Sequence, residues 1–109
     1  MVVNQWFTGC KPCRQEMPEL SEWKDEMPDV MFFSSTYETP EVARQVLNKV
    51  RFNWIAIVNG TQFCEWVGDR VYPMTIIIDK EGMNAMIEFV TSPEKRETIK
   101  NTINSLRKP

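Results

Sequence analysis

Two cysteines separated by two residues stand where a predicted strand gives way to a predicted helix. Residues 2–7 have the pattern of a short strand, and a turn follows at residues 8–10. The helix starts around Lys11-Pro12, because proline suits the first helical turn. Free backbone N–H groups and the positive end of a helix stabilise an anion at this point. The pattern therefore favours a thiolate on Cys10, with a pKa below the ordinary value of about 8.5.

This arrangement suits the two steps of thiol–disulfide exchange. Cys10 is the expected nucleophile, and Lys11 and Arg14 add positive charge nearby. Cys13 stands one turn further into the helix, where it is expected to be less exposed. It can attack a mixed disulfide formed by Cys10 and release the reduced substrate.

The cysteines also allow other interpretations. A zinc site needs further N or S ligands, and only Cys64 remains in a chain without histidine. Attachment of a c-type haem needs histidine after the second cysteine, where Arg14 stands. Two inert cysteines are a third alternative, which the strand–turn–helix context disfavours. Cys64, beside Phe63 and Trp66, is expected to be a buried apolar residue, with a redox thiol or an intermolecular bridge as the alternatives.

Composition limits the function further. The length of 109 residues indicates one domain, and 13 basic against 15 acidic residues give a net charge of −2. The scattered basic residues argue against nucleic acid or an anionic membrane surface as a partner held by charge. The absence of histidine removes catalytic triads, Cys–His dyads and HExxH zinc sites. No apolar run approaches the roughly 20 residues that span a bilayer, and no signal peptide is recognisable.

The remaining elements predict an α/β sandwich with a mixed sheet. Helices are expected over residues 11–27, after a Thr39 cap with Pro40 in the first turn, and from Ser92-Pro93-Glu94 onward. Strands are expected over residues 30–34, 55–58, 74–79 and 83–90, and residues 63–67 are ambiguous and a candidate for a short helix.

Two segments carry a resemblance to a known family. Residues 2–20, VVNQWFTGCKPCRQEMPEL, are similar to the pattern VVNFWATWCxPCRxExPxL, and residues 72–82, YPMTIIIDKEG, to YP-x-T-x-x-x-D-x-x-G. These are patterns of TlpA/ResA-type thiol–disulfide oxidoreductases in the thioredoxin superfamily. The resemblance implies a thioredoxin-like three-layer sandwich over residues 1–109, with a mixed central sheet flanked by helices. The family carries at least one strand before the catalytic strand, so an N-terminal strand is expected to be missing here.

The resemblance also implies roles for individual residues. Cys10 matches the exposed attacking cysteine and Cys13 the resolving one, with no cofactor beyond their redox-active disulfide. Pro73 matches a cis-proline that faces the cysteines, and the backbone of Tyr72 would pair with an extended substrate peptide; an ordinary trans proline is the alternative. Glu16 matches an acidic residue that could accept the proton of Cys13; a solvated surface glutamate is the alternative.

Several positions depart from the family pattern. Gly9 replaces a tryptophan, which predicts a more open Cys10 and a more mobile turn. Gln5 replaces a core phenylalanine, and a buried amide needs hydrogen-bond partners. Tyr72 is bulkier than the usual residue and would restrict substrate access. Asn4 stands where classical thioredoxins bury an aspartate.

The sequence therefore predicts a thiol–disulfide oxidoreductase that acts on protein disulfides and depends on a redox partner protein. The resemblance implies a cell-envelope location, periplasmic or extracytoplasmic. A membrane tether outside this chain and a homodimer through an exposed sheet edge are further expectations. A redox-inactive module of the same fold, which only binds a peptide or protein, is the alternative function.

Overall fold

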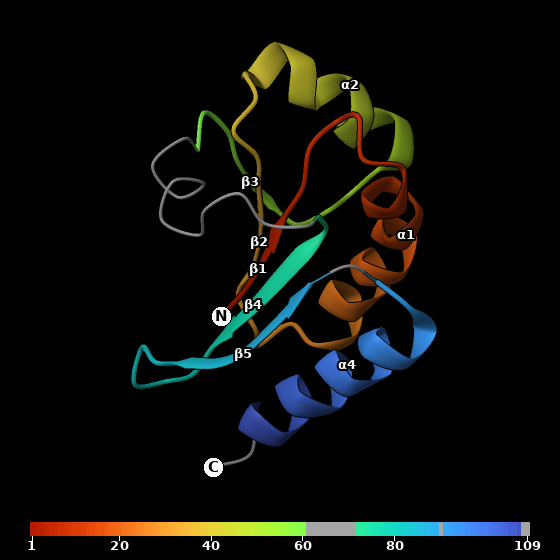
Figure 1. Cartoon of the computed structure of the whole chain (residues 1–109). Helices are drawn as coiled ribbons and strands as arrows, with labels where there is room; N and C mark the ends of the chain where they lie inside the picture. The colour runs from red at the N-terminus through yellow and green to blue at the C-terminus, as the bar shows by residue number, and fades with distance from the viewer. Residues whose placement is uncertain (61–71, 90, 108–109) are drawn as a thin grey trace.

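A five-stranded mixed sheet forms the centre of the computed structural model, which describes residues 1–60, 72–89 and 91–107 (Figure 1). The strands are β1 (Val2–Gln5), β2 (Phe32–Ser35), β3 (Ile55–Ile57), β4 (Met74–Ile78) and β5 (Asn84–Phe89). Their order is β3-β2-β1-β4-β5, with β1, β2 and β3 parallel and β4 antiparallel to β1 and β5. The strand β1 is therefore central, with neighbours on both sides.

A residue whose side chain caps the helix directly precedes each of the first two described helices. The helices are α1 (Lys11–Glu26), α2 (Pro40–Val50) and α4 (Pro93–Arg107). The hydroxyl of Thr39 accepts a hydrogen bond from the backbone N–H of Val42 at 3.4 Å, which confirms the predicted cap of α2. Cys10 takes the same position before α1. The helix α1 ends before Pro28, as the sequence predicts.

The three described helices share one face of the sheet (Figure 1). The parallel connections from β1 to β2 and from β2 to β3 cross the sheet in the same direction. Because such connections are right-handed as a rule, α1 and α2 are expected on the same side. One core cluster joins the strand residues Val2, Phe32 and Ile77 to Leu20 of α1, Ala43 of α2 and Ile99 of α4. A second cluster, centred on Met74 and Ile76, lies apart from it. The predicted mixed sheet with flanking helices is thus confirmed, and within the described residues the helices cover one of its two faces.

The bounds of all five strands differ from the predictions by one or two residues, and the largest differences are at β1 and β2. The strand β1 stops at Gln5 because the carbonyl of Phe7 instead closes a turn with Cys10. The strand β2 starts at Phe32, because the N–H of Val30 bonds to Met27 in the chain reversal after α1. Residues 63–67 and Cys64 lie outside the described residues.

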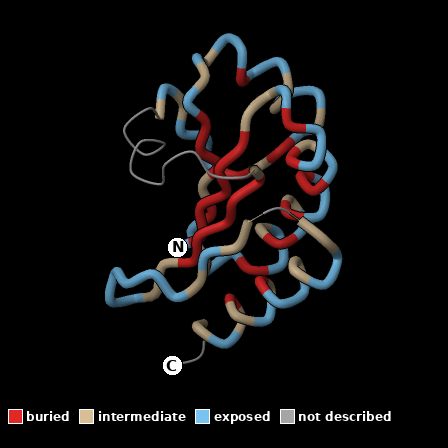
Figure 2. The backbone as a smooth tube through the Cα atoms, viewed as in Figure 1, coloured by how far each residue is buried: buried red, intermediate tan, exposed pale blue. Residues whose placement is uncertain are grey.

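The sheet brings three segments to one end. The carboxyl ends of β1 and β2 lie side by side, because Gln5 pairs with Ser35. The strand β4 begins at the same end, because Gln5 also pairs with Met74. The turn after β1, the loop after β2 and Pro73 therefore gather around the start of α1. Figure 2 shows that the central strands leading there are buried.

Candidate redox site

Cys10 and Cys13 form a disulfide at the amino end of α1. Cys10 is the N-cap residue, and its Sγ accepts a hydrogen bond from the backbone N–H of Cys13 at 3.2 Å. Cys13 is fully buried, whereas Cys10 keeps 5% of its surface exposed. The structure thus confirms the predicted placement of Cys10 at the helix end. A sulfur anion there would receive the N–H groups and the positive helix end.

The turn before Cys10 is a tight one. The N–H of Cys10 donates to the carbonyl of Phe7 at 3.1 Å, which leaves Thr8 and Gly9 at the two corners. A Cβ at Gly9 would lie 3.1 Å from the Phe7 ring, so this ring fills the space beside Gly9. Cys10 itself is buried, so the structure does not show the open cysteine that the sequence predicts.

The ring of Phe7, the first residue of this turn, contacts two tyrosine rings. The ring of Phe7 meets that of Tyr72 edge to face at a centroid distance of 5.2 Å, and that of Tyr37 at 6.4 Å. Tyr72 precedes Pro73 through a cis peptide bond, so the predicted cis-proline is confirmed. Pro73 is buried, and Tyr72 packs against the core cluster that contains both cysteines.

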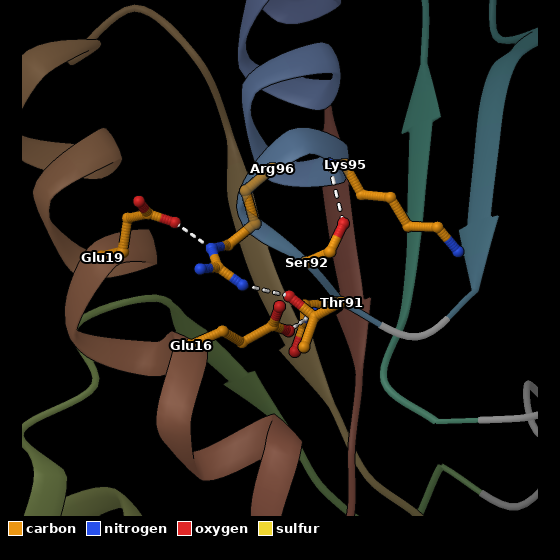
Figure 3. A network of polar contacts seen from close by, with 7 residues as sticks. Glu16, Glu19, Thr91, Ser92, Lys95 and Arg96 are labelled. Atoms are coloured by element: carbon orange, nitrogen blue, oxygen red, sulfur yellow. Dashed lines mark hydrogen bonds and ion pairs between the residues drawn. The ribbon is translucent and has the colours of Figure 1, made fainter.

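Glu16 is a buried carboxyl on the same helix as the cysteines. Only 4% of its surface is exposed, so the alternative of a solvated glutamate is wrong. Its Oε1 accepts a hydrogen bond from Nδ2 of Asn4 at 2.9 Å. Thr91 also hydrogen-bonds to this carboxylate (Figure 3). Burial raises the pKa of Glu16 above its ordinary value, against the opposing effect of these bonds.

A chain of polar contacts connects Glu16 to the helix α4 (Figure 3). The guanidinium of Arg96 donates to the Thr91 hydroxyl at 2.6 Å and pairs with Glu19 of α1. The positive charge of Arg96 also lowers the pKa of Glu16, but less than burial raises it. Thr91 and Arg96 are not predicted from the sequence, because 75 or more positions separate them from Glu16 and no motif links them.

Two further properties of the described residues concern metals and membranes. Within residues 1–60, 72–89 and 91–107, no group of three His, Cys, Asp or Glu side chains is placed to hold a metal ion. No helix in the described part of the chain combines the length and the apolar character that a membrane crossing requires.

Comparison with solved structures defines the fold. A DsbE-like thiol:disulfide interchange protein from Chlorobium tepidum superposes with a TM-score of 0.88 at 17% identity, over 96% of this chain and 77% of that one. An exposed lipoprotein thioredoxin from Streptococcus pneumoniae gives a TM-score of 0.79 at 18% identity, over 96% and 83%. The chain therefore has a thioredoxin-like fold, as the sequence predicts.

Sequence comparison then points to particular relatives, although no protein-family model matches the chain. The thioredoxin-like protein YneN of Bacillus subtilis is 26% identical over 87% of this chain and 59% of its own length. The thiol–disulfide oxidoreductase ResA of Bacillus anthracis is 24% identical over 95% of this chain and 61% of its own. The resemblance to thiol–disulfide oxidoreductases is confirmed. The chain spans about three fifths of the length of these relatives.

Proposed function

We propose that the chain is a thiol–disulfide oxidoreductase that exchanges its Cys10–Cys13 dithiol with protein disulfides. The observation that carries this proposal is the sulfur of Cys10 at the N-cap of α1, within hydrogen-bond distance of a backbone N–H and bonded to Cys13. This position favours a thiolate once the disulfide is reduced. The chemistry needs only the two sulfurs, so no dissolved cofactor is invoked.

In the first step, the Cys10 thiolate attacks one sulfur of the substrate disulfide. A mixed disulfide forms, the substrate S–S bond breaks, and one substrate sulfur leaves as a thiolate that takes up a proton. In the second step, the thiolate of Cys13 attacks Sγ of Cys10. The internal disulfide forms and the second substrate sulfur leaves, so that two electrons pass to the substrate. A redox partner protein then returns two electrons to the Cys10–Cys13 disulfide.

Glu16 is the base that we assign to the second step. It stands three residues after Cys13 on α1, which places the two side chains on one helix face. Burial raises the pKa of this carboxyl, and a higher pKa makes it a better proton acceptor near neutral pH. We expect Glu16→Gln to slow the release of substrate from the mixed disulfide while leaving the attack by Cys10 unchanged.

Tyr72 and Pro73 are the residues that we assign to substrate binding. Both lie at the sheet end that carries the cysteine turn, since Met74 pairs with Gln5. The backbone of Tyr72 would pair with an extended substrate peptide, and Pro73 would provide an apolar wall beside the sulfurs. Contact between the Tyr72 and Phe7 rings supports this assignment, because it connects the proline loop to the cysteine turn.

The proposed partners are a protein disulfide substrate and a redox partner protein, and the proposed location is the cell envelope. The similarity to an exposed lipoprotein thioredoxin supports this location. A membrane tether outside this chain and a homodimer remain predictions. An exposed edge of the sheet, which a homodimer through strand pairing requires, is present at β3.

Thiol release from a disulfide-bonded peptide by the pre-reduced chain tests the proposal. We expect Cys10→Ser to abolish this reaction, and Cys13→Ser to accumulate a mixed disulfide that mass spectrometry detects. Cys64→Ser is the matched control and should retain the wild-type rate. Equal rates for the wild type and Cys10→Ser would contradict the proposal and leave the binding module as the function. A reduction potential well above the thioredoxin value of about −270 mV would indicate an oxidant rather than a reductant.

A further inference from the structure

A carboxylate from a distant part of the chain holds the turn that carries Cys10. Glu38 lies in the loop between β2 and α2, at the same end of the sheet as the turn (Figure 1). Its Oε1 accepts a hydrogen bond from the backbone N–H of Thr8, and its Oε2 accepts one from the Thr8 hydroxyl, both at 2.7 Å. Hydrogen bonds to a charged acceptor are stronger than neutral ones, and a two-pronged contact also fixes orientation. The carboxylate therefore fixes both the place and the direction of Thr8.

A side chain of α1 also bonds to Thr8. The guanidinium of Arg14 donates a hydrogen bond to the carbonyl oxygen of Thr8. Together with the two bonds to Glu38, this gives every polar group of Thr8 a partner outside the turn. Thr8 is a corner of the turn whose last residue is Cys10. A shift of Thr8 would thus move the nucleophile relative to the helix end.

Glu38 is itself anchored to the sheet. Its backbone N–H donates to the hydroxyl of Thr36 at 3.3 Å, and this hydroxyl donates to the Glu38 carboxylate at 3.2 Å. Its carbonyl accepts a hydrogen bond from the N–H of Asn59, after β3, at 2.9 Å. Thr36 directly follows β2 and is fully buried. Glu38 therefore connects the turn to the ends of two parallel strands.

We propose that Glu38 is a positioning residue for Cys10, which it holds at the amino end of α1 through its bonds to Thr8. This inference rests on the proposed thiol–disulfide exchange. Gly9 has no side chain with which to fix the turn, so the polar contacts of Thr8 supply that restraint. Glu38 acts through Thr8 and needs no contact with the sulfur atoms.

The sign of the effect separates positioning from a direct effect of charge. A carboxylate near a thiolate disfavours the thiolate, so loss of the charge alone would make Cys10 more reactive. Loss of the bonds to Thr8 would instead release Cys10 from the helix end and make it less reactive. The start of α1 itself carries two cationic residues, Lys11 and Arg14, which every test variant retains.

The test measures the pH profile of Cys10 alkylation by iodoacetamide in the reduced full-length chain, with the modified site assigned by peptide mass spectrometry. Glu38→Ala removes the bonds and the charge, whereas Glu38→Gln removes the charge but keeps two polar atoms for Thr8. Glu41→Ala, in the exposed first turn of α2, is the matched control. We expect Glu38→Ala to slow alkylation about fivefold near pH 6.5 and to move the profile to higher pH, with the other two variants within about twofold of the wild type.

Several outcomes would overturn this assignment. Faster alkylation in both Glu38 variants would show that the carboxylate acts by its charge, and unchanged rates in both would show no effect on Cys10. If Glu38→Ala does not fold by circular dichroism, Thr8→Val replaces it, because it removes only the hydroxyl bond; a smaller loss in the same direction is expected, and no loss overturns the proposal. A wild-type Cys10 that reacts no faster than a cysteine in an unstructured peptide would contradict the proposed function instead.

Discussion

The strands β1 and β3 belong to the same parallel part of the sheet, yet their burial is opposite to their hydropathy. The strand β1 reads VVNQ, and all four residues are buried, including the amides of Asn4 and Gln5. The strand β3 reads IAI, and all three residues are exposed, with Ile55 at 46% and Ile57 at 41%. Position in the sheet explains the difference, since β1 is central and β3 is at the edge.

The buried amide of Asn4 on β1 donates a hydrogen bond to the carboxyl of Glu16. A central strand position filled by an apolar side chain would leave the Glu16 carboxylate without one of its hydrogen bonds. Asn4 also donates to the Thr75 hydroxyl at 3.3 Å, so it connects β1 to both α1 and β4. Asn4 on β1 thus binds the carboxyl that we assign to the proposed reaction, whereas the residues of β3 are exposed. Variants of the two strands test this distinction.

The largest effect is expected for Asn4→Asp. In the wild type, the amide of Asn4 donates a hydrogen bond to the Glu16 carboxyl at 2.9 Å. The change replaces this amide with a second carboxyl. Ionising two adjacent buried carboxyls is unfavourable because their charges repel. We therefore expect a loss of about 3–5 kcal/mol in unfolding free energy near pH 8, and a smaller loss near pH 4, where a carboxyl can keep its proton. Denaturant unfolding at several pH values measures it.

The double variant Asn4→Asp/Glu16→Gln is the matched control. It exchanges the acid and the amide between β1 and α1, so the pair again holds one carboxylate and one amide. We expect it to recover most of the lost stability. A single variant as stable as the wild type near pH 8 would show that the two side chains do not interact as described.

A smaller effect, with a defined pH dependence, is expected for Glu16→Gln. Burial raises the pKa of Glu16 in the folded chain, so the folded state keeps this proton at pH values where the unfolded state has lost it. The contribution of Glu16 to stability therefore falls as the pH rises through the window above its ordinary pKa. We expect Glu16→Gln to gain stability relative to the wild type over that window, by at most about 1.4 kcal/mol per pH unit.

Thermal or denaturant unfolding of both proteins across the pH range measures this difference. The subtraction removes groups that titrate equally in the two chains. A difference that stays constant with pH, or that grows toward low pH, would contradict a raised pKa for the buried carboxyl.

The smallest effect is expected at the edge strand. Ile55→Thr and Ile57→Thr keep a β-branched residue at exposed positions, so we expect changes within about 0.5 kcal/mol in unfolding free energy. Val3→Thr on β1 is the matched comparison, because Val3 is 6% exposed and a hydroxyl there costs about 1–2 kcal/mol. Equal losses on β1 and β3 would remove the contrast between the two strands.

Local patterns in the sequence determined most of the elements and the centre of the site. The cap at Thr39, the start of α1 near Pro12 and the placement of Cys10 depend on neighbouring residues, which is why the sequence predicts them. The cis bond before Pro73 was predicted only from the family resemblance. The sequence leaves the burial of Glu16 open, because a helix face does not show what packs on it.

Tertiary structure alone decided which distant groups meet around the cysteines. Glu38 reaches Thr8 across 30 positions, and Thr91 reaches Glu16 from the far end of the chain. It also decided that the apolar strand β3 is exposed while the amides of β1 are buried. The physical reason is that side-chain periodicity and capping act over a few residues. Burial and long-range hydrogen bonds, in contrast, depend on which strands are neighbours in the sheet and which elements pack on it.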